Sequence, residues 1–338
     1  MLFNFSKKRQ QTDQSAVLAS LNSNGVSLAI NELIRYQNKA SLINLGASKS
    51  LHGKMSGNYL ARSKGRGMEF DEVRHYQTGD DIRAIDWRVT ARTGKTHTKL
   101  FREEIERPVL IATDLTSSMF FGSQLLFKSV QSAHIAALVA WHAKARGDRL
   151  GGLVFNQFSH QELKPRSRKQ GVLHYLQAMV DKHAESFEHM VSDSQNPNAN
   201  DNIASCQQVF EDNCRRLRQL AKPGSLVYLI TDGRHLTEES IKHLALVNQH
   251  CELIIALVSD PLEQSLPDFN ARVNVEITDG ANREQLTLGD SRTKLKYQQE
   301  AYKRQQHLKH LIEKSGARLL AFDAGTSLET QLKNGGHV

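Results

Sequence analysis

The sequence has few of the residues that mark secreted, membrane-spanning or thiol-based proteins. Its three cysteines, Cys206, Cys214 and Cys251, form neither a disulfide framework nor a CxxC metal site. The longest apolar runs, such as 253–258, hold six or seven residues, whereas a membrane-spanning helix needs about 20. In the N-terminal MLFNFSKKRQQ the apolar residues precede the charges, the reverse of a secretory signal. These absences predict a cytoplasmic protein with reduced thiols, either free or held peripherally at the inner membrane.

Positive charge is concentrated in the N-terminal third of the chain. Residues 1–107 hold 18 Lys and Arg against 11 Asp and Glu, whereas the other 231 residues hold 26 against 25. Such an excess suits nucleic acid, anionic lipid or an acidic protein partner. The region has neither zinc-finger spacing nor an aromatic RNA-binding signature, so a generic basic face or a protein-docking surface is favoured over nucleic-acid binding.

From residue 107 onward, short apolar runs alternate with helical patterns. The runs PVLIAT, LVYLIT, IIALVS and RLLAF are typical of strands buried on both faces, and they are followed in turn by Asp114, Asp232, Asp260 and Asp323. Residues 150–155 form another such run. Helical spacing covers residues 125–145, 202–221, 237–249 and 295–315. This alternation predicts an α/β fold, with a central, mostly parallel sheet flanked by helices.

The composition also predicts domain boundaries. Residues 1–25 are expected to be a flexible tail, and 26–106 an N-terminal extension. That extension would start with one or two short helices in 26–46 and continue with an exposed basic loop, 47–67. The α/β domain is expected over 107–330, followed by a C-terminal tail, 331–338.

A metal site is predicted at the carboxyl edge of the sheet. The first strand leads into Asp114-Leu115-Thr116-Ser117-Ser118, the pattern D-x-T-x-S, and Asp232 follows a second strand. Parallel strands bring their carboxyl ends to one edge, and Mg²⁺ prefers such hard oxygen ligands. Asp114, Thr116, Ser118 and Asp232 are therefore candidate magnesium ligands, with Asp114 expected on an exposed edge. Alternatively, Asp114, Thr116 and Ser118 merely cap the next helix.

This arrangement resembles the metal-ion-dependent adhesion site of von Willebrand factor A domains. There a D-x-S-x-S motif, a threonine on a second loop and an aspartate on a third loop surround the ion. Thr116 replaces the first serine and keeps its hydroxyl group. The second-loop threonine has no counterpart in residues 198–202, where Asp201 is a possible substitute, so the site is expected to be partly degenerate.

The stretch 65–108 mixes acidic and basic residues with two aromatic residues, Phe70 and Trp87. One interpretation is a network of ion pairs that fixes a long loop against the sheet domain, with Trp87 as a packed anchor. The other is a docking face for a partner, since Arg and aromatic residues dominate interfaces. The candidate partner-binding residues are Arg74, Asp80, Asp81, Arg83, Asp86, Trp87 and Arg88.

Two enzymatic interpretations of the same stretch are disfavoured. Residues 92–96, RTGKT, are similar to the end of a phosphate-binding loop, but the required first glycine is replaced by Val89 and a strand pattern follows instead of a helix. A two-metal hydrolase built on Asp80, Asp81 and Asp86 is the second. Each of these acids has an arginine close in sequence, so ion pairing explains them more simply.

The same stretch carries a family resemblance. The pattern G-x-G-x-E-F-x-x-V-R-x-Y-x-x-G-D-D-x-R-x-I-D-W, residues 65–87, resembles the signature of the bacterial family called domain of unknown function 58. Further matching positions are Ala91-Arg92, the segment 99–104, the element Asp260-Pro261-Leu262-Glu263 with Leu266-Pro267, and Tyr302. The signature proper spans 65–104, and the resemblance covers roughly residues 26–330.

The resemblance implies a von Willebrand factor A-like domain with a Rossmann-like sheet and an adhesion-type metal motif that is often incomplete. It also implies a MoxR-type AAA+ ATPase as partner, with chaperone-like maturation or assembly of a client protein as the shared task. We therefore expect a non-enzymatic adaptor, with Mg²⁺ as the candidate ion. The alternatives are a metal-dependent hydrolase that uses the strand-end carboxylates, and nucleic-acid binding through the basic N-terminal third.

Overall fold

The computed structural model describes residues 14–42, 68–103, 107–193, 203–267, 272–278 and 283–333. These residues form two units. The larger unit takes the described parts of 1–47 and 107–338, and the smaller unit takes those of 48–106. Among the described helices, none is both long and apolar enough to cross a membrane.

A six-stranded sheet forms the centre of the larger unit. Its strands are β3 (Pro108–Asp114), β4 (Arg149–Phe155), β5 (His160–Arg166), β6 (Leu226–Thr231), β7 (Glu252–Ser259) and β10 (Arg318–Asp323). The order is β10-β7-β6-β3-β4-β5, and every neighbouring pair is parallel except β4 with β5. The predicted α/β fold class, a mostly parallel sheet flanked by helices, is confirmed.

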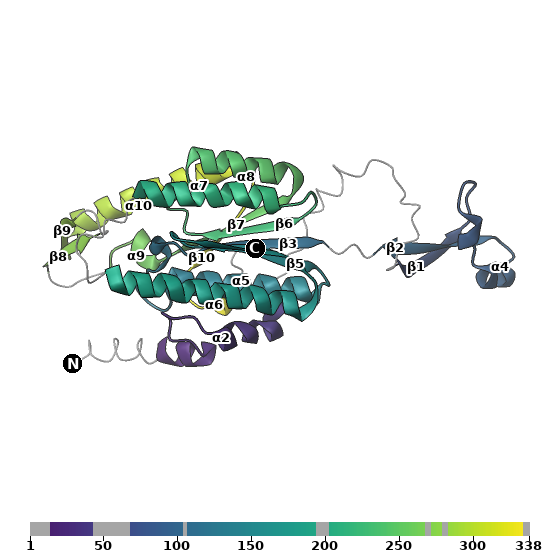
Figure 1. Ribbon diagram of the computed structural model, residues 1–338, viewed down its shortest axis with the longest axis horizontal. Coiled ribbons are helices and arrows are strands. Elements are labelled where there is room, and N and C mark those ends of the chain that lie inside the picture. The colour runs from purple at the N-terminus through teal and green to yellow at the C-terminus, as the bar shows by residue number, and fades with distance from the viewer. Residues whose placement is uncertain are drawn as a thin grey trace. The chain divides into compact units, whose positions relative to one another are not determined.

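Helices cover both faces of this sheet (Figure 1). On one face lie α5 (Lys128–Ala145) and α6 (Arg168–Asp193), and on the other lie α7 (Ile203–Leu220), α8 (Glu238–His250) and α10 (Ser291–Ser315). The core accordingly consists of two hydrophobic clusters, one for each face. Strands covered on both sides must be apolar at nearly every position, which is why LVYLIT in β6 is buried throughout.

The N-terminal segment packs on the larger unit, which corrects the predicted boundaries. Residues 14–21 are helical, and α2 (Ile30–Ile34) and η1 (Arg35–Leu42) follow. Leu21, Leu33 and Tyr36 are buried, and the indole nitrogen of Trp141 donates to the carbonyl of Leu33 at 3.0 Å. Residues 14–25 are therefore not a tail. The N-terminal segment packs against α5, a helix that is buried at nearly every position. Residues 1–13 and the expected basic loop 47–67 lie outside the described residues.

The smaller unit is built on a β-hairpin. Strand β1 (Met68–His75) pairs antiparallel with β2 (His97–Glu103), and between them lie η2 (Ile82–Ala84) and α4 (Trp87–Thr93). Helix α4 ends at Gly94, whose φ of 69° is the left-handed conformation that favours glycine at a helix end.

The larger unit also contains short elements beside its sheet. These are η3 (Ser117–Met119), α9 (Pro261–Gln264), the antiparallel pair β8 (Val273–Thr278) and β9 (Arg283–Leu288), and α11 (Leu328–Lys333). Helix α11 takes in residues 331–333 of the expected C-terminal tail, and residues 334–338 are outside the description.

Candidate functional site

The strand order reverses direction at β3, in the middle of the sheet. The next strand along the chain, β4, pairs with one side of β3, and β6 pairs with its other side. Ligands of open α/β sheets bind at the carboxyl ends of the strands where the order reverses in this way. Asp114 ends β3 and Asp232 follows β6, so the two residues meet at this point.

Asp114 is wholly buried there, so its expected exposed position is wrong. Its Oδ1 accepts hydrogen bonds from the backbone N–H and hydroxyl of Thr116 at 2.9 and 2.8 Å, and its Oδ2 accepts from the Thr231 hydroxyl at 2.8 Å. Burial raises the pKa of Asp114, and the neighbouring charge of Asp232 raises it further. The carboxyl group therefore fixes the loop between β3 and η3 onto β6.

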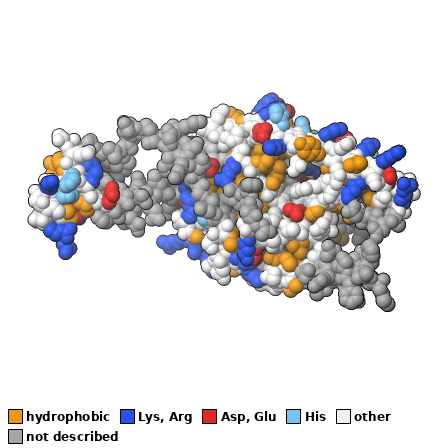
Figure 2. All heavy atoms as spheres, turned by 180° about the vertical axis from the view of Figure 1, so that it is seen from behind, with side chains coloured by type: hydrophobic (Ala, Val, Ile, Leu, Met, Phe, Trp, Pro, Cys, Tyr) orange, Lys and Arg blue, Asp and Glu red, His pale blue; other side chains and the backbone are white. Residues whose placement is uncertain are grey.

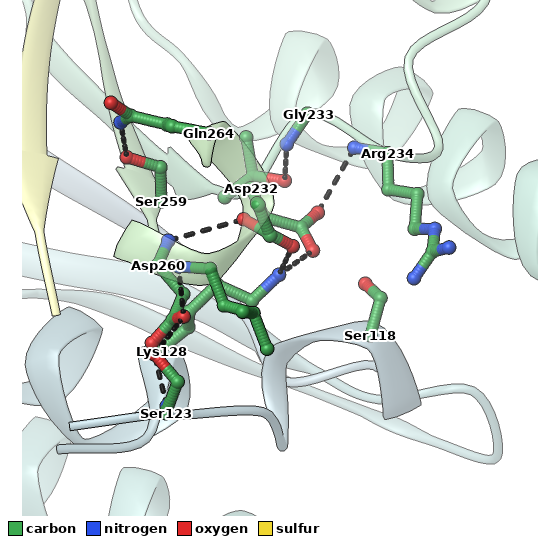
Figure 3. A network of polar contacts seen from close by, with 12 residues as sticks. Ser118, Ser123, Lys128, Asp232, Gly233, Arg234, Ser259, Asp260 and Gln264 are labelled. Atoms are coloured by element: carbon green, nitrogen blue, oxygen red, sulfur yellow. Dashed lines mark hydrogen bonds and ion pairs between the residues drawn. The ribbon is translucent and has the colours of Figure 1, made fainter. Parts of the chain in front are cut away.

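The other two predicted ligands complete a polar cluster around these aspartates. The hydroxyl oxygens of Thr116 and Ser118 lie 3.4 Å apart, and the Ser118 hydroxyl group lies near the Asp232 carboxylate (Figure 3). The structure thus brings together all four residues of the predicted site. Thr116 directly precedes η3, but its side chain makes no capping hydrogen bond to that helix. The helix-cap interpretation is therefore not supported for Thr116.

A lysine that the sequence analysis does not predict lies within this cluster. The Nζ atom of Lys128 lies 2.8 Å from Oδ2 of Asp232 and 2.7 Å from Oε1 of Glu263 (Figure 3). The Lys128 side chain is 0% exposed and that of Asp232 is 3% exposed, so both charges of this pair are removed from water. Such a pair is stable only when each charge has its partner.

The pKa values in this cluster reflect that pairing. Burial alone would raise the pKa of Asp232, but the charge of Lys128 and its hydrogen bond hold that pKa below its usual value. Burial alone would lower the pKa of Lys128, but Asp232 and Glu263 together raise it. Both groups are therefore ionised at neutral pH.

These residues do not fit a divalent cation. Of the two carboxylates predicted as ligands, Asp232 is already paired with the ammonium group of Lys128, and both oxygens of Asp114 accept hydrogen bonds from the protein. Within the described ranges, no group of three or more His, Cys, Asp or Glu side chains is placed to hold a metal ion. Asp201, the possible substitute for the second-loop threonine, lies outside these ranges.

Asp260, which follows β7, organises the loops around the cluster. It is buried, and its carboxylate accepts from the backbone N–H of Ser123 and of Leu262, both at 2.8 Å. It also forms a capping box with Glu263, whose Oε2 accepts from the Asp260 N–H at 3.1 Å. This box fixes Glu263 so that its Oε1 reaches Lys128.

Asp323, the fourth strand-end acid, has a local role. Its carboxylate accepts from the Gly325 N–H at 3.1 Å, and burial raises its pKa.

Beside Asp232, a cavity of about 320 Å³ opens toward α10. It is lined by polar residues, which include Arg234, Gln298 and Arg304, and by apolar ones, which include Leu257, Ala301 and Leu308.

Three acidic residues of the 65–108 stretch, Asp80, Asp81 and Asp86, stabilise the smaller unit locally. Arg74 pairs with Asp80 at 2.7 Å, as the ion-pair interpretation expects, and Asp80 also accepts from the Gln77 N–H at 2.9 Å. These contacts, the Gln77 N–H first, lower the pKa of Asp80. Asp81 caps η2 through the Arg83 N–H.

Asp86 caps α4. Its carboxylate accepts from the backbone N–H of Arg88 and Val89 at 3.0 and 3.1 Å, and Lys99 lies 3.7 Å away. The hydrogen bond from Val89 is the main cause of its lowered pKa. Capping accounts for Asp81 and Asp86 without a metal. Residues 95–96 lead into β2, so no helix start follows the RTGKT segment.

Trp87 is exposed within the smaller unit, so it is not a packed anchor of that unit. Its exposed fraction is 67%, and that of Ile82 is 66%. Arg83 and Arg88 are exposed beside them in sequence. Among the described residues, neither arginine has a side-chain ion pair with an acid. We call Ile82, Arg83, Trp87 and Arg88 the signature face. The side chain of Phe70 lies outside the description.

The signature face belongs to the segment that identifies the family. A family model described as "Protein of unknown function DUF58" matches residues 72–308, more than two thirds of the chain. The chain belongs to the DUF58 family. Both the signature face and the cluster around Lys128 fall within the matched range.

Curated relatives match over a shorter stretch. Uncharacterized proteins of Mycobacterium bovis and Mycobacterium tuberculosis are each 31% identical over 128 residues, which is 38% of this chain. The match spans only 40% of the length of those relatives.

Two solved structures are similar at 12% identity. They are BatB from Bacteroides thetaiotaomicron, with a TM-score of 0.37, and an aerotolerance-related membrane protein from Bacteroides fragilis, with a TM-score of 0.40. Each match covers 68% of this chain, and 94% and 97% of the respective solved chain. At these TM-scores neither likeness carries an argument about function.

Proposed function

We propose that this DUF58 chain is a non-enzymatic adaptor that binds a MoxR-type AAA+ ATPase and a client protein, in chaperone-like maturation or assembly of client complexes. In this proposal the signature face binds the ATPase. The carboxyl edge of the sheet, with the cavity beside Asp232, is the surface offered to the client.

The exposure of Trp87 and Ile82 is the observation that carries the proposal. The two large apolar side chains are 67% and 66% exposed, and exposed arginines flank both. Exposed apolar surface lowers solubility, so we attribute it here to binding of a partner. Aromatic and arginine side chains are the residues that contribute most to protein interfaces. The caps by Asp81 and Asp86 and the Arg74–Asp80 pair hold this face in one conformation, which lowers the entropy cost of binding.

The hydrolase alternative receives less support. A metal-dependent hydrolase needs carboxylates available to a metal ion, whereas Asp232 is paired with Lys128 and Asp86 caps a helix. Nucleic-acid binding needs Lys and Arg gathered along one face. On the face drawn in Figure 2, basic side chains are interspersed with acidic and apolar ones.

The proposal is tested by measuring the affinity of the full-length chain for a purified MoxR-type ATPase from the same organism. We expect Trp87→Ala to weaken binding at least tenfold, because truncation of an interface aromatic residue costs about 2 kcal/mol or more. Ile82→Ala should weaken it by a smaller factor.

Leu295→Ala is the matched control. Leu295 lies on α10 in the larger unit and is 58% exposed, so its truncation also removes exposed apolar surface. Equal losses for Trp87→Ala and Leu295→Ala would show that the effect is not specific to the signature face. Turnover of phosphoesters by the purified chain, abolished by Asp232→Asn, would favour the hydrolase instead.

A further inference from the structure

Lys128 occupies an unusual position for a lysine. It is the first residue of α5, where the partial positive charge of the helix N-terminus disfavours a cation, and its side chain is 0% exposed. Fifteen of the eighteen residues of α5 are buried, so this is a core helix that begins with a charge. A lysine is tolerated there only because strong partners stabilise it.

Those partners come from distant parts of the chain. Asp232 follows β6 and Glu263 belongs to α9, and their carboxylate oxygens lie 2.8 and 2.7 Å from Nζ. Figure 3 shows the Lys128 ammonium group directed at the Asp232 carboxylate, with the Ser118 hydroxyl group near that carboxylate. The ring of Phe121 lies 5.9 Å from the same nitrogen atom.

Without the lysine, the same cluster would be a set of oxygen ligands. It would hold the carboxylates of Asp232 and Glu263 and the nearby hydroxyl group of Ser118, whose oxygen lies 3.4 Å from that of Thr116. Oxygen ligands with two or more carboxylates suit hard divalent cations. The ammonium group contributes the positive charge that such an ion would otherwise supply, and it uses the lone pairs that would bind the ion.

We infer that Lys128 is the built-in cation of this site: its ammonium group replaces a divalent metal ion, so the native site takes up neither Mg²⁺ nor Mn²⁺, and removal of the ammonium group creates a divalent-cation site. The adaptor would then contact its client without a metal, and chelators would leave that contact unchanged.

Direct titration with Mn²⁺ tests this inference, because electron paramagnetic resonance distinguishes free from bound Mn²⁺. The full-length native chain should show no saturable binding up to about 1 mM Mn²⁺, the weak end of natural divalent sites. Lys128→Met, which keeps most of the side-chain volume, should bind one Mn²⁺ per chain below that concentration. Saturating Mn²⁺ should raise the Tm of Lys128→Met by about 2–4 °C and leave that of the native chain unchanged.

Two further variants control for other causes. Lys182→Met removes another partly buried lysine that pairs with a carboxylate, Glu185, and a hydroxyl group, Ser159, so it should gain no Mn²⁺ site. Adding Asp232→Asn to Lys128→Met should abolish the gained site, because it removes the central carboxylate.

Removal of Lys128 leaves Asp232 buried without its partner, so Lys128→Met is expected to be less stable. If that variant folds only when Mn²⁺ is present, the metal replaces the lost charge and the inference is supported. Stoichiometric Mn²⁺ binding by the native chain would overturn it. So would a Lys128→Met chain that folds without binding Mn²⁺, or one that stays unfolded at saturating Mn²⁺.

Discussion

His183 gives the fold a measurable dependence on acid. It lies on α6 with 1% of its surface exposed, its Nε2 is 3.0 Å from the Ser129 hydroxyl oxygen, and its ring is 4.9 Å from that of Phe120. Burial lowers the pKa of His183 from 6.5 to about 4, and the charge of Glu32 offsets this only in part. Replacing this imidazole should therefore change how stability depends on pH.

The sign and size follow from the two pKa values. The unfolded chain takes up a proton near pH 6.5, whereas the folded chain does so only near pH 4. The stability contributed by the neutral imidazole is thus complete above pH 6.5 and is lost as the pH falls toward 4. A gap of about 2.5 between the pKa values corresponds to a loss of about 3 kcal/mol, since one pKa unit is worth about 1.4 kcal/mol.

Urea unfolding at a series of pH values between 7.5 and 4 measures this loss. His183→Gln keeps a polar group beside Ser129 but does not titrate, so the native chain should lose about 3 kcal/mol more than this variant over the range. His174→Gln removes an exposed imidazole from the same helix and serves as the control. Curves for the native chain and His183→Gln that stay parallel throughout would refute the reasoning.

Three substitutions test the packing of the two units. Asp114→Ala should lower the free energy of unfolding by about 3 kcal/mol, because it leaves the buried donors on Thr116 and Thr231 without their acceptor; a change below about 0.5 kcal/mol in urea unfolding would contradict this. Leu33→Ala should lower the free energy of unfolding by about 2–5 kcal/mol and speed proteolysis of residues 14–42, because Leu33 is wholly buried where the N-terminal segment packs on α5. Equal cleavage rates in the native and variant chains would be evidence against that packing. Trp87→Ala should leave the Tm within about 1 °C of the native value, because the side chain is largely exposed, and a drop of several degrees would show that it is an anchor after all.

The central sheet was predictable because strands that are covered on both faces are apolar at nearly every position, and this pattern is visible in the sequence. LVYLIT in β6 is apolar at five of six positions because helices cover both of its faces, and burial of β6 at every position bears this out. Helix α6 went unpredicted although Val172, Leu176 and Met179 have helical spacing and are buried. The N-terminal segment was misassigned because its few apolar residues are buried against elements that are distant in sequence, chiefly α5, which lies about 100 residues away.

The candidate site could be predicted only in part. Asp114 and Asp232 were predictable neighbours because parallel strands share an edge. The pairing of Lys128 with Asp232 was not, since it joins residues 104 positions apart. A local signal existed nonetheless, because a lysine at the first position of an apolar helix opposes the helix dipole. Trp87 was misplaced because its size suggests burial, whereas the short hairpin unit leaves it exposed.

The adaptor proposal is tested most directly by hydrogen exchange on the native chain with and without a MoxR-type ATPase. The account predicts that backbone amides of residues 82–93, in η2 and α4, exchange at least tenfold more slowly in the complex, because the signature face becomes covered. Binding of the ATPase that leaves exchange in 82–93 unchanged, and slows it elsewhere, would contradict the account.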